Sequence, residues 1–153
     1  MKKSLNKFTV IVDTREQKPY LFKRCGNIER CVRKKLDHGD YQIDNLPNLI
    51  TIERKKDVNE LILNLTKHRK RFIAELERMQ SSKYRFVIVE DYWSSIWKSS
   101  FSKASPNSIF GSIVAFEIRY GVHFVFCGNR RFAMSMTRQL LTRAYKEMYE
   151  KNS

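Results

Sequence analysis

The sequence predicts a single α/β domain over residues 1–153, in which a mixed central sheet is flanked by helices. Three observations predict this class. Extended segments dominate the first part of the chain, and helical and extended segments alternate in the rest. A length of 153 residues suits one domain with one sizeable core. A hydrophobic content of 42%, with only 5 Gly and 3 Pro, excludes a disordered chain.

The first part of the chain contains four predicted extended segments. β-Branched residues predict a strand over 7–12, and a shorter extended stretch follows over 31–36. Two more strands are predicted over 40–43 and 49–54. The turn-forming residues 45–48 separate these two strands, so we expect an antiparallel hairpin.

From residue 57 onward, apolar residues recur at helical spacing. Asp57 and Glu60 resemble a capping box and predict the start of a helix. Ser105 and Pro106 predict another helix start, and Gly121 ends that helix. The other predicted elements are a helix over 69–79, a helix over 105–120, strands over 84–89 and 122–127, and a last helix over 130–149.

The serine-rich segment 94–105 has two open interpretations. It can be a mobile excursion, or it can be a short helix, because Trp93, Trp97 and Phe101 recur at helical spacing.

The chain is strongly basic, with 30 Lys and Arg against 16 Asp and Glu and a net charge of +14. This imbalance favours a polyanionic partner, either nucleic acid or an anionic membrane. We expect no membrane partner, because no apolar stretch approaches the length of a transmembrane helix and the first residues lack a signal peptide. The three Cys and three His have no metal-type spacing, which favours reduced thiols in the cytoplasm and disfavours zinc.

Acidic residues gather at the predicted strand ends. Glu53 and Lys55 lie two residues apart and therefore share one face of a strand. The hairpin brings Asp40 close to Glu53, and Asp13 and Glu16 follow the first strand. Carboxylates of this kind suit Mg²⁺ and metal-assisted phosphodiester cleavage, with Lys55 beside the attacking water. The alternative is a set of surface charges in ion pairs, which is the better account of any single carboxylate.

Three motifs in order resemble the signature of the XPF-type nuclease domain family. They are Asp13-Thr14-Arg15-Glu16, Gly39-Asp40-Tyr41 and Ile52-Glu53-Arg54-Lys55. The resemblance extends over nearly the whole chain and is greatest to small bacterial and prophage members. It implies a restriction-endonuclease-like core and Mg²⁺- or Mn²⁺-dependent incision of branched or flap DNA.

The resemblance also implies roles for individual residues. Asp13, Asp40 and Glu53 would hold the metal, with Glu16 beside them. Arg54 and Lys55 would form a basic catalytic pair, and Arg15 would lie near the scissile phosphate.

The chain departs from the family pattern in two places. Asn59 stands where the family usually has an acidic residue, and we expect activity to survive this loss of charge. The chain also has no Gly-rich helix-hairpin-helix motif, so we expect a stand-alone domain that binds DNA by itself or with a partner. The predicted DNA contacts are Lys67, Arg69, Lys70, Arg71, Arg33, Lys34 and Lys35.

Tyr41, Trp93 and Trp97 are candidates for stacking on unpaired bases, with core packing as the alternative. His38 is interpreted as a turn residue.

The resulting hypothesis is a metal-dependent DNA endonuclease of repair, recombination or phage DNA processing. We expect it to act as a homodimer, or otherwise as a heteromer, through the helix over 105–120 and the last helix. We expect it in the bacterial or phage-infected cytoplasm, or in the nucleus of a eukaryote. The alternatives are a catalytically silent DNA-binding subunit and a nuclease of ordinary duplex or single-stranded DNA. The presence of Asp40, Glu53 and Lys55 argues against a silent subunit.

Overall fold

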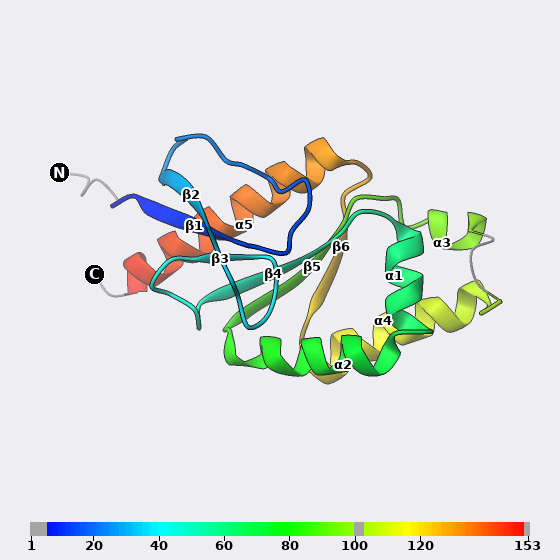
Figure 1. The fold of residues 1–153 in the computed structure, drawn as a ribbon. Helices are drawn as coiled ribbons and strands as arrows, with labels where there is room; N and C mark the ends of the chain where they lie inside the picture. The colour runs from blue at the N-terminus through cyan, green and yellow to red at the C-terminus, as the bar shows by residue number, and fades with distance from the viewer. Residues whose placement is uncertain (1–5, 100–102, 152–153) are drawn as a thin grey trace.

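A six-stranded mixed sheet forms the centre of the molecule (Figure 1). The structure, a computed structural model, describes residues 6–99 and 103–151. The strands are β1 (Phe8–Asp13), β2 (Ile28–Lys34), β3 (Tyr41–Ile43), β4 (Ile50–Lys55), β5 (Tyr84–Val89) and β6 (His123–Phe126). Their order in the sheet is β2-β1-β3-β4-β5-β6. The predicted fold class is therefore confirmed.

Strand β3 is antiparallel to both of its neighbours, β1 and β4, and the other neighbouring pairs are parallel. The predicted hairpin of β3 and β4 is confirmed. The extended stretch expected over 31–36 was misplaced, because β2 begins at the fully buried Ile28 and ends at Lys34. Leu36 instead uses its backbone N–H and C=O to bind Asp13 and Arg15.

These directions bring the carboxyl ends of β1, β4 and β5 to one edge of the sheet, together with the start of β3. Asp13 ends β1, Asp40 precedes β3, and Lys55 ends β4. The carboxyl edge is where open α/β sheets place their ligands. The topology thus gathers acidic and basic residues that are far apart in the sequence.

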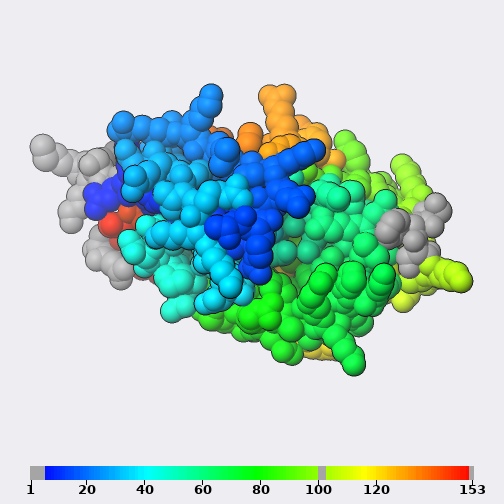
Figure 2. Space-filling model, viewed as in Figure 1, coloured from blue at the N-terminus to red at the C-terminus, as the bar shows by residue number. Residues whose placement is uncertain are grey.

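Helices cover both faces of the sheet (Figure 1). They are α1 (Val58–Leu65), α2 (Arg69–Arg78), α3 (Ser95–Lys98), α4 (Pro106–Tyr120) and α5 (Arg130–Lys151), and the 3₁₀ helix η1 (Met79–Ser81) follows α2. Strand residues alternate between two clusters. Val87 and Val89 pack with α1, α2 and α4, whereas Ile88 packs with α5. In Figure 2, the N-terminal segments (blue to cyan) meet α1 and α2 (green) on one face of the molecule.

The predicted helix ends are confirmed in detail. The Asp57 side chain accepts the Glu60 N–H at 2.8 Å, and the Ser105 hydroxyl accepts the Ser108 N–H at 3.1 Å. Gly121 ends α4 with a left-handed φ of 57°. The segment 94–105 contains the short helix α3, and Phe101 lies outside the described residues. No helix in the described ranges combines the length and the apolar character needed to cross a membrane.

Gly39 generates a stability prediction. Its φ is 71°, and an added Cβ would lie 2.2 Å from Thr51 Oγ1. Gly39→Ala should therefore lower the free energy of unfolding by about 2 kcal/mol or more, as measured by urea denaturation. Gly111→Ala in α4 is the matched control, because an added Cβ there meets nothing within 4 Å. Equal stability of the two variants would contradict the close packing of Gly39 against β4.

Candidate active site

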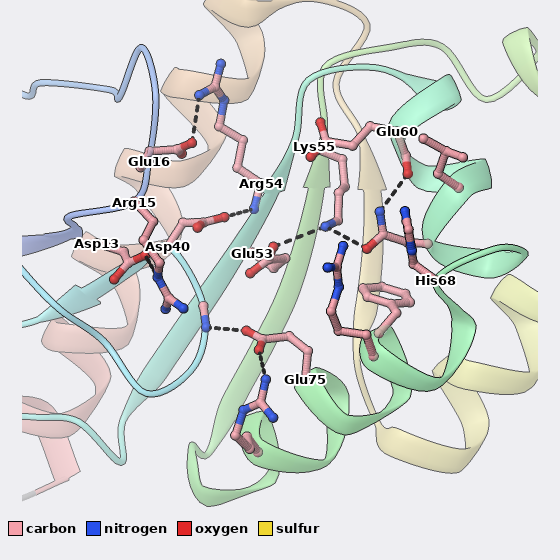
Figure 3. Close-up of a pocket in the computed structure, with 16 residues that line it drawn as sticks. Asp13, Arg15, Glu16, Asp40, Glu53, Arg54, Lys55, Glu60, His68 and Glu75 are labelled. Atoms are coloured by element: carbon pink, nitrogen blue, oxygen red, sulfur yellow. Dashed lines mark hydrogen bonds and ion pairs between the residues drawn. The ribbon is translucent and has the colours of Figure 1, made fainter.

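A pocket of about 570 Å³ lies at the carboxyl edge of the sheet (Figure 3). Its walls come from the β1–β2 loop, the residues just before β3, the end of β4, and helices α1 and α2. Among the predicted site residues, Asp13, Arg15, Glu16, Asp40, Glu53, Arg54 and Lys55 all line it. The sheet topology therefore brings together the three motifs singled out in the sequence.

Asp40 is held in place by the backbone of β4. Its N–H donates to Ile52 O at 2.8 Å, and its Oδ2 accepts the Arg54 N–H at 2.8 Å. Burial, followed by the charges of Glu53 and Glu16, raises the pKa of Asp40 well above its ordinary value. The hairpin thus places a carboxyl group where its ionisation is opposed by two other carboxylates.

Glu53 and Lys55 lie on one face of β4, and Glu53 Oε1 is 3.1 Å from Lys55 Nζ (Figure 3). The Glu53 side chain is only 14% exposed. Burial raises the pKa of Glu53, Lys55 opposes that rise, and Glu75 adds to it. Asp40 and Glu53 therefore form a partly buried acidic pair that one neighbouring ammonium does not neutralise.

The Lys55 ammonium is enclosed by polar and aromatic groups. Its Nζ donates to Asn64 Oδ1 at 3.3 Å and lies 5.2 Å from the centre of the Phe72 ring. Burial acts to lower the pKa of Lys55, but Glu53 and Glu60 raise it above the ordinary value. The amine stays protonated, so Lys55 can orient a water or a phosphate oxygen but cannot accept a proton.

Asp13 is engaged by protein donors. Its Oδ2 accepts from Arg15 Nε at 2.8 Å, and its Oδ1 accepts the Leu36 N–H at 2.9 Å. Burial acts to raise the pKa of Asp13, but these hydrogen bonds lower it below its ordinary value. Asp13 therefore holds Arg15 beside the pocket rather than presenting a free oxygen to it.

The structure separates Arg54 from Lys55, which were expected to form a basic catalytic pair. Adjacent residues of a strand point to opposite faces, and Figure 3 shows Arg54 extending toward Glu16 and away from Lys55. Arg54 pairs with Glu90 at 2.6 Å and with Glu16 at 3.3 Å. The backbone N–H of Arg54 binds Asp40 in the pocket, whereas its side chain points away from Lys55 and is only 7% exposed.

The donor set fits a hard divalent cation held by two carboxylates. Asp40 and Glu53 repel each other, and the second oxygen of Glu16, Oε2, is buried without a hydrogen-bond partner among the described residues. Mg²⁺ binds through one or two carboxylates together with waters and substrate phosphate. Within 6–99 and 103–151, no group of three or more His, Cys, Asp and Glu has an arrangement that could hold a metal ion. A metal role for Asp13 beside Asp40 and Glu53 stays a prediction.

The pocket also contains residues that the sequence did not single out. Glu75 of α2 accepts the Gly39 N–H at 2.7 Å, next to Asp40 (Figure 3). Asn64 contacts Lys55, and His68 and Arg78 complete the wall on the helix side. Glu75 and Arg78 have the spacing of an exposed helical ion pair. Nothing in the sequence shows that α2 turns this pair toward β4.

The predicted DNA contacts near the start of α2 differ in exposure. Lys67, Lys70 and Arg71 are exposed around the start of α2, and Arg71 lines the pocket. Arg69 is instead held between helices, because its Nη1 donates to Leu65 O and Ser112 Oγ and its guanidinium lies over the Phe116 ring.

On β2, Arg33 binds the carbonyls of Thr14 and Glu16, and Lys34 pairs with Asp44 at 3.1 Å. Lys35, just beyond the strand, is exposed.

Four residues with open roles also have clear positions. Tyr41 is fully buried and stacks on Tyr20 at 5.2 Å between ring centres, so it belongs to the core. Trp93 and Trp97 are 37% and 46% exposed and pack against each other. His38 is a buried turn residue within 3.3 Å of Ser82 Oγ.

Asn59 lies outside the Asp40–Glu53 pocket. It is in the first turn of α1, where its Oδ1 accepts from Ser99 Oγ at 2.8 Å, and it lines a neighbouring pocket. An acidic side chain at residue 59 would therefore lie outside the walls of the pocket that contains Asp40 and Glu53.

A comparison with protein families matches residues 12–140 to the ERCC4 domain. The chain belongs to the ERCC4 domain family. The match includes all three motifs at the carboxyl edge of this ERCC4 domain, and it confirms the resemblance inferred from them. A search of curated proteins finds no match.

Solved structures confirm the restriction-endonuclease-like fold of the ERCC4 domain. XPF from Aeropyrum pernix matches with a TM-score of 0.69 and 18% identity, over 89% of this chain and 61% of that one. XPF from Aeropyrum pernix in complex with DNA matches with a TM-score of 0.65 and 17% identity, over 95% of this chain and 66% of that one. The chain thus spans about two thirds or less of the length of these proteins.

The raised pKa of Asp40 leads to a prediction about the pH dependence of stability. Because the pKa of Asp40 is raised on folding, the folded state holds its proton more tightly than the unfolded state does. The contribution of Asp40 to stability should therefore be fully present below its unfolded pKa and fall as pH rises through its raised folded pKa. In urea denaturation with a chelator present, Asp40→Asn should flatten this fall.

Glu77→Gln, an exposed change on α2, is the control and should keep the wild-type profile. An unchanged pH profile in Asp40→Asn would contradict the repulsion described at this pair. Added Mg²⁺ should restore stability at pH 8 in the wild type and restore little in Asp40→Asn.

Proposed function

We propose that this ERCC4 domain is a metal-dependent endonuclease that hydrolyses DNA phosphodiester bonds. The observation that carries the proposal is the partly buried pair of Asp40 and Glu53, with the Lys55 ammonium beside it, at the open carboxyl edge of the sheet. Two carboxylates that destabilise each other are suited to holding a divalent cation. The proposed cofactor is Mg²⁺, with Mn²⁺ as its substitute.

The residues of the pocket have distinct proposed roles. Asp40 and Glu53 would hold the cation, which polarises a phosphate and makes water more acidic when it is bound. Lys55, fixed by Glu53 and Asn64, would orient the attacking water or a phosphate oxygen. Arg15, with a 66% exposed side chain aligned by Asp13, would contact the phosphate at the rim.

DNA is the proposed substrate, with a preference for branched or flap structures. A net charge of +14 provides the electrostatic attraction, and Lys67, Lys70 and Arg71 are exposed beside the pocket. One similar structure, XPF from Aeropyrum pernix, is described as a complex with DNA. The branched preference rests on the family resemblance, and it points to a role in repair, recombination or phage DNA processing in the cytoplasm.

We also propose that the domain acts as a homodimer. Phe110, Val114 and Ile118 form an exposed apolar stripe along α4, and Ile118 is 84% exposed. On the other side of the edge strand β6, exposed Phe132 and Met136 of α5 line an apolar hollow of about 480 Å³. Exposed apolar side chains on both sides of a sheet edge are typical of a protein interface.

Cleavage of a substrate panel tests the enzymatic proposal. With Mg²⁺ or Mn²⁺, the wild type should cut labelled flap or fork DNA faster than linear duplex or single strands. Asp40→Asn and Glu53→Gln should each lower the rate by about a thousandfold or more, because they remove a proposed metal ligand. Glu77→Gln should cut like the wild type.

Failure of the wild type to cut any substrate would leave the silent DNA-binding subunit as the better account. Equal rates on flap and duplex DNA would support a nuclease of ordinary DNA. Full activity of Asp40→Asn would show that the proposed site is wrong.

The dimer is tested by light scattering coupled to gel filtration. Ile118→Glu places a charge at the most exposed residue of the α4 stripe and should weaken dimerisation by about a hundredfold or more. Leu21→Glu is the matched control, because Leu21 is 63% exposed in the β1–β2 connection and belongs neither to the α4 stripe nor to the lining of the α5 hollow. A wild type that stays monomeric at high concentration would contradict the proposal.

A further inference from the structure

The loop that follows β1, residues 14–19, carries Arg15 and Glu16 into the candidate site. It lies between two strands but contributes no residue to either of them. The Glu16 N–H donates to Asp13 O at 3.1 Å, and the Tyr20 N–H just after the loop donates to the Tyr41 hydroxyl at 2.8 Å. Most of the carbonyl groups between these two points are bound by side chains.

Arginines from three separate elements bind these carbonyls. Arg33 of β2 donates through Nη2 to Thr14 O at 3.0 Å and to Glu16 O at 2.7 Å. Arg54 of β4 donates through Nη1 to Gln17 O at 3.2 Å and to Lys18 O at 3.1 Å.

The third arginine is at the start of α5. Arg130 donates through Nη2 to Pro19 O at 3.1 Å. Five carbonyls of a six-residue loop are thus held by Arg33, Arg54 and Arg130, which we call the arginine clamp.

Arg54 and Arg130 are themselves anchored around Tyr20 and Glu90. The two guanidinium carbons lie 4.7 Å and 4.9 Å from the centre of the Tyr20 ring. Both guanidinium groups pair with Glu90 Oε1, Arg54 at 2.6 Å and Arg130 at 3.9 Å, and the Tyr20 hydroxyl donates to the same oxygen. A planar fork of five donors can serve an acid and several carbonyls at once, which a lysine cannot do.

The backbone of the loop is not a relaxed one. Lys18 has a φ of 50°, a left-handed conformation that is uncommon for a residue other than glycine. Such a conformation persists only where surrounding contacts impose it. Here the adjoining contacts come from the clamp, because Arg54 binds the Lys18 carbonyl and Arg130 binds the next one.

We propose that Arg33, Arg54 and Arg130 are positioning residues that hold the loop over 14–19 and so set Arg15 and Glu16 against the Asp40–Glu53 pocket. This inference rests on the proposed nuclease function where it concerns catalysis. Arg54 acts through the loop and touches neither DNA nor the cation. Arg33 and Arg130, although basic, are not phosphate contacts.

Charge-conserving substitutions test the clamp without first requiring activity. Arg54→Lys and Arg130→Lys keep the positive charge and remove the fork. Arg131→Lys, at the same end of α5, is the matched control. In NMR hydrogen exchange, the amides of Glu16 and Tyr20 should exchange about tenfold faster in both clamp variants and at the wild-type rate in the control.

Cleavage and binding provide the second set of measurements. In both clamp variants kcat should fall by about tenfold while KM changes by less than about twofold, because the loop and its Arg15 are misplaced but the exposed contacts Lys67, Lys70 and Arg71 remain. The slope of log affinity against log salt, measured with a chelator present, should be unchanged in Arg130→Gln and Arg33→Gln.

Wild-type exchange at Glu16 and Tyr20 together with a lower kcat would overturn the clamp and make Arg54 a group that acts on the substrate. A salt slope reduced by about 0.9 in Arg130→Gln or Arg33→Gln, with wild-type exchange at Glu16 and Tyr20, would make that residue a phosphate contact. If Arg54→Lys does not fold, the exposed Arg33 and Arg130 decide the question. If the wild type does not cut DNA, the nuclease proposal fails while the exchange result still tests the clamp.

Discussion

The alternation of side chains along β4 is the constraint on which the rest of the site depends. Glu53 and Lys55 face the pocket, and Arg54 faces the opposite side of the sheet. The Arg54 N–H also binds the Asp40 carboxylate, so a single residue joins the acidic pair to the network behind it. A slip of one residue in the β3–β4 register would move Glu53 and Lys55 away from the pocket and turn Arg54 toward it. The acidic pair and the Arg54 network would then be lost together.

Much of the fold and part of the site could be predicted from the sequence, because local signals carry them. Helix starts at Asp57 and Ser105 depend on side chains that bind backbone groups three residues ahead. The shared face of Glu53 and Lys55 follows from strand geometry alone. The bounds of β2 were missed, because they depend on which residues reach the β1 edge and the core rather than on any local pattern.

The partners of the charged residues could not be predicted from local sequence signals. Arg54 meets Glu90, which is 36 residues away, and Glu75 reaches Gly39 from a helix whose sequence suggests only an exposed ion pair. Arg69 resembles its basic neighbours in the sequence, yet it is held between α2 and α4. Which basic residues are free to meet a phosphate is decided by tertiary contacts, and composition does not contain that information.

Charges are balanced on one side of β4 and unbalanced on the other. On one side, the guanidinium of Arg54 compensates the charges of Glu16 and Glu90. In the pocket, Asp40 and Glu53 exceed the charge of Lys55, and Gly39 is kept in a left-handed turn to place Asp40 there. Uncompensated charge stabilises nothing in the isolated chain, and this is the physical reason for proposing that a cation binds there. In that proposal, the clamped loop adds Arg15 at the position of the phosphate.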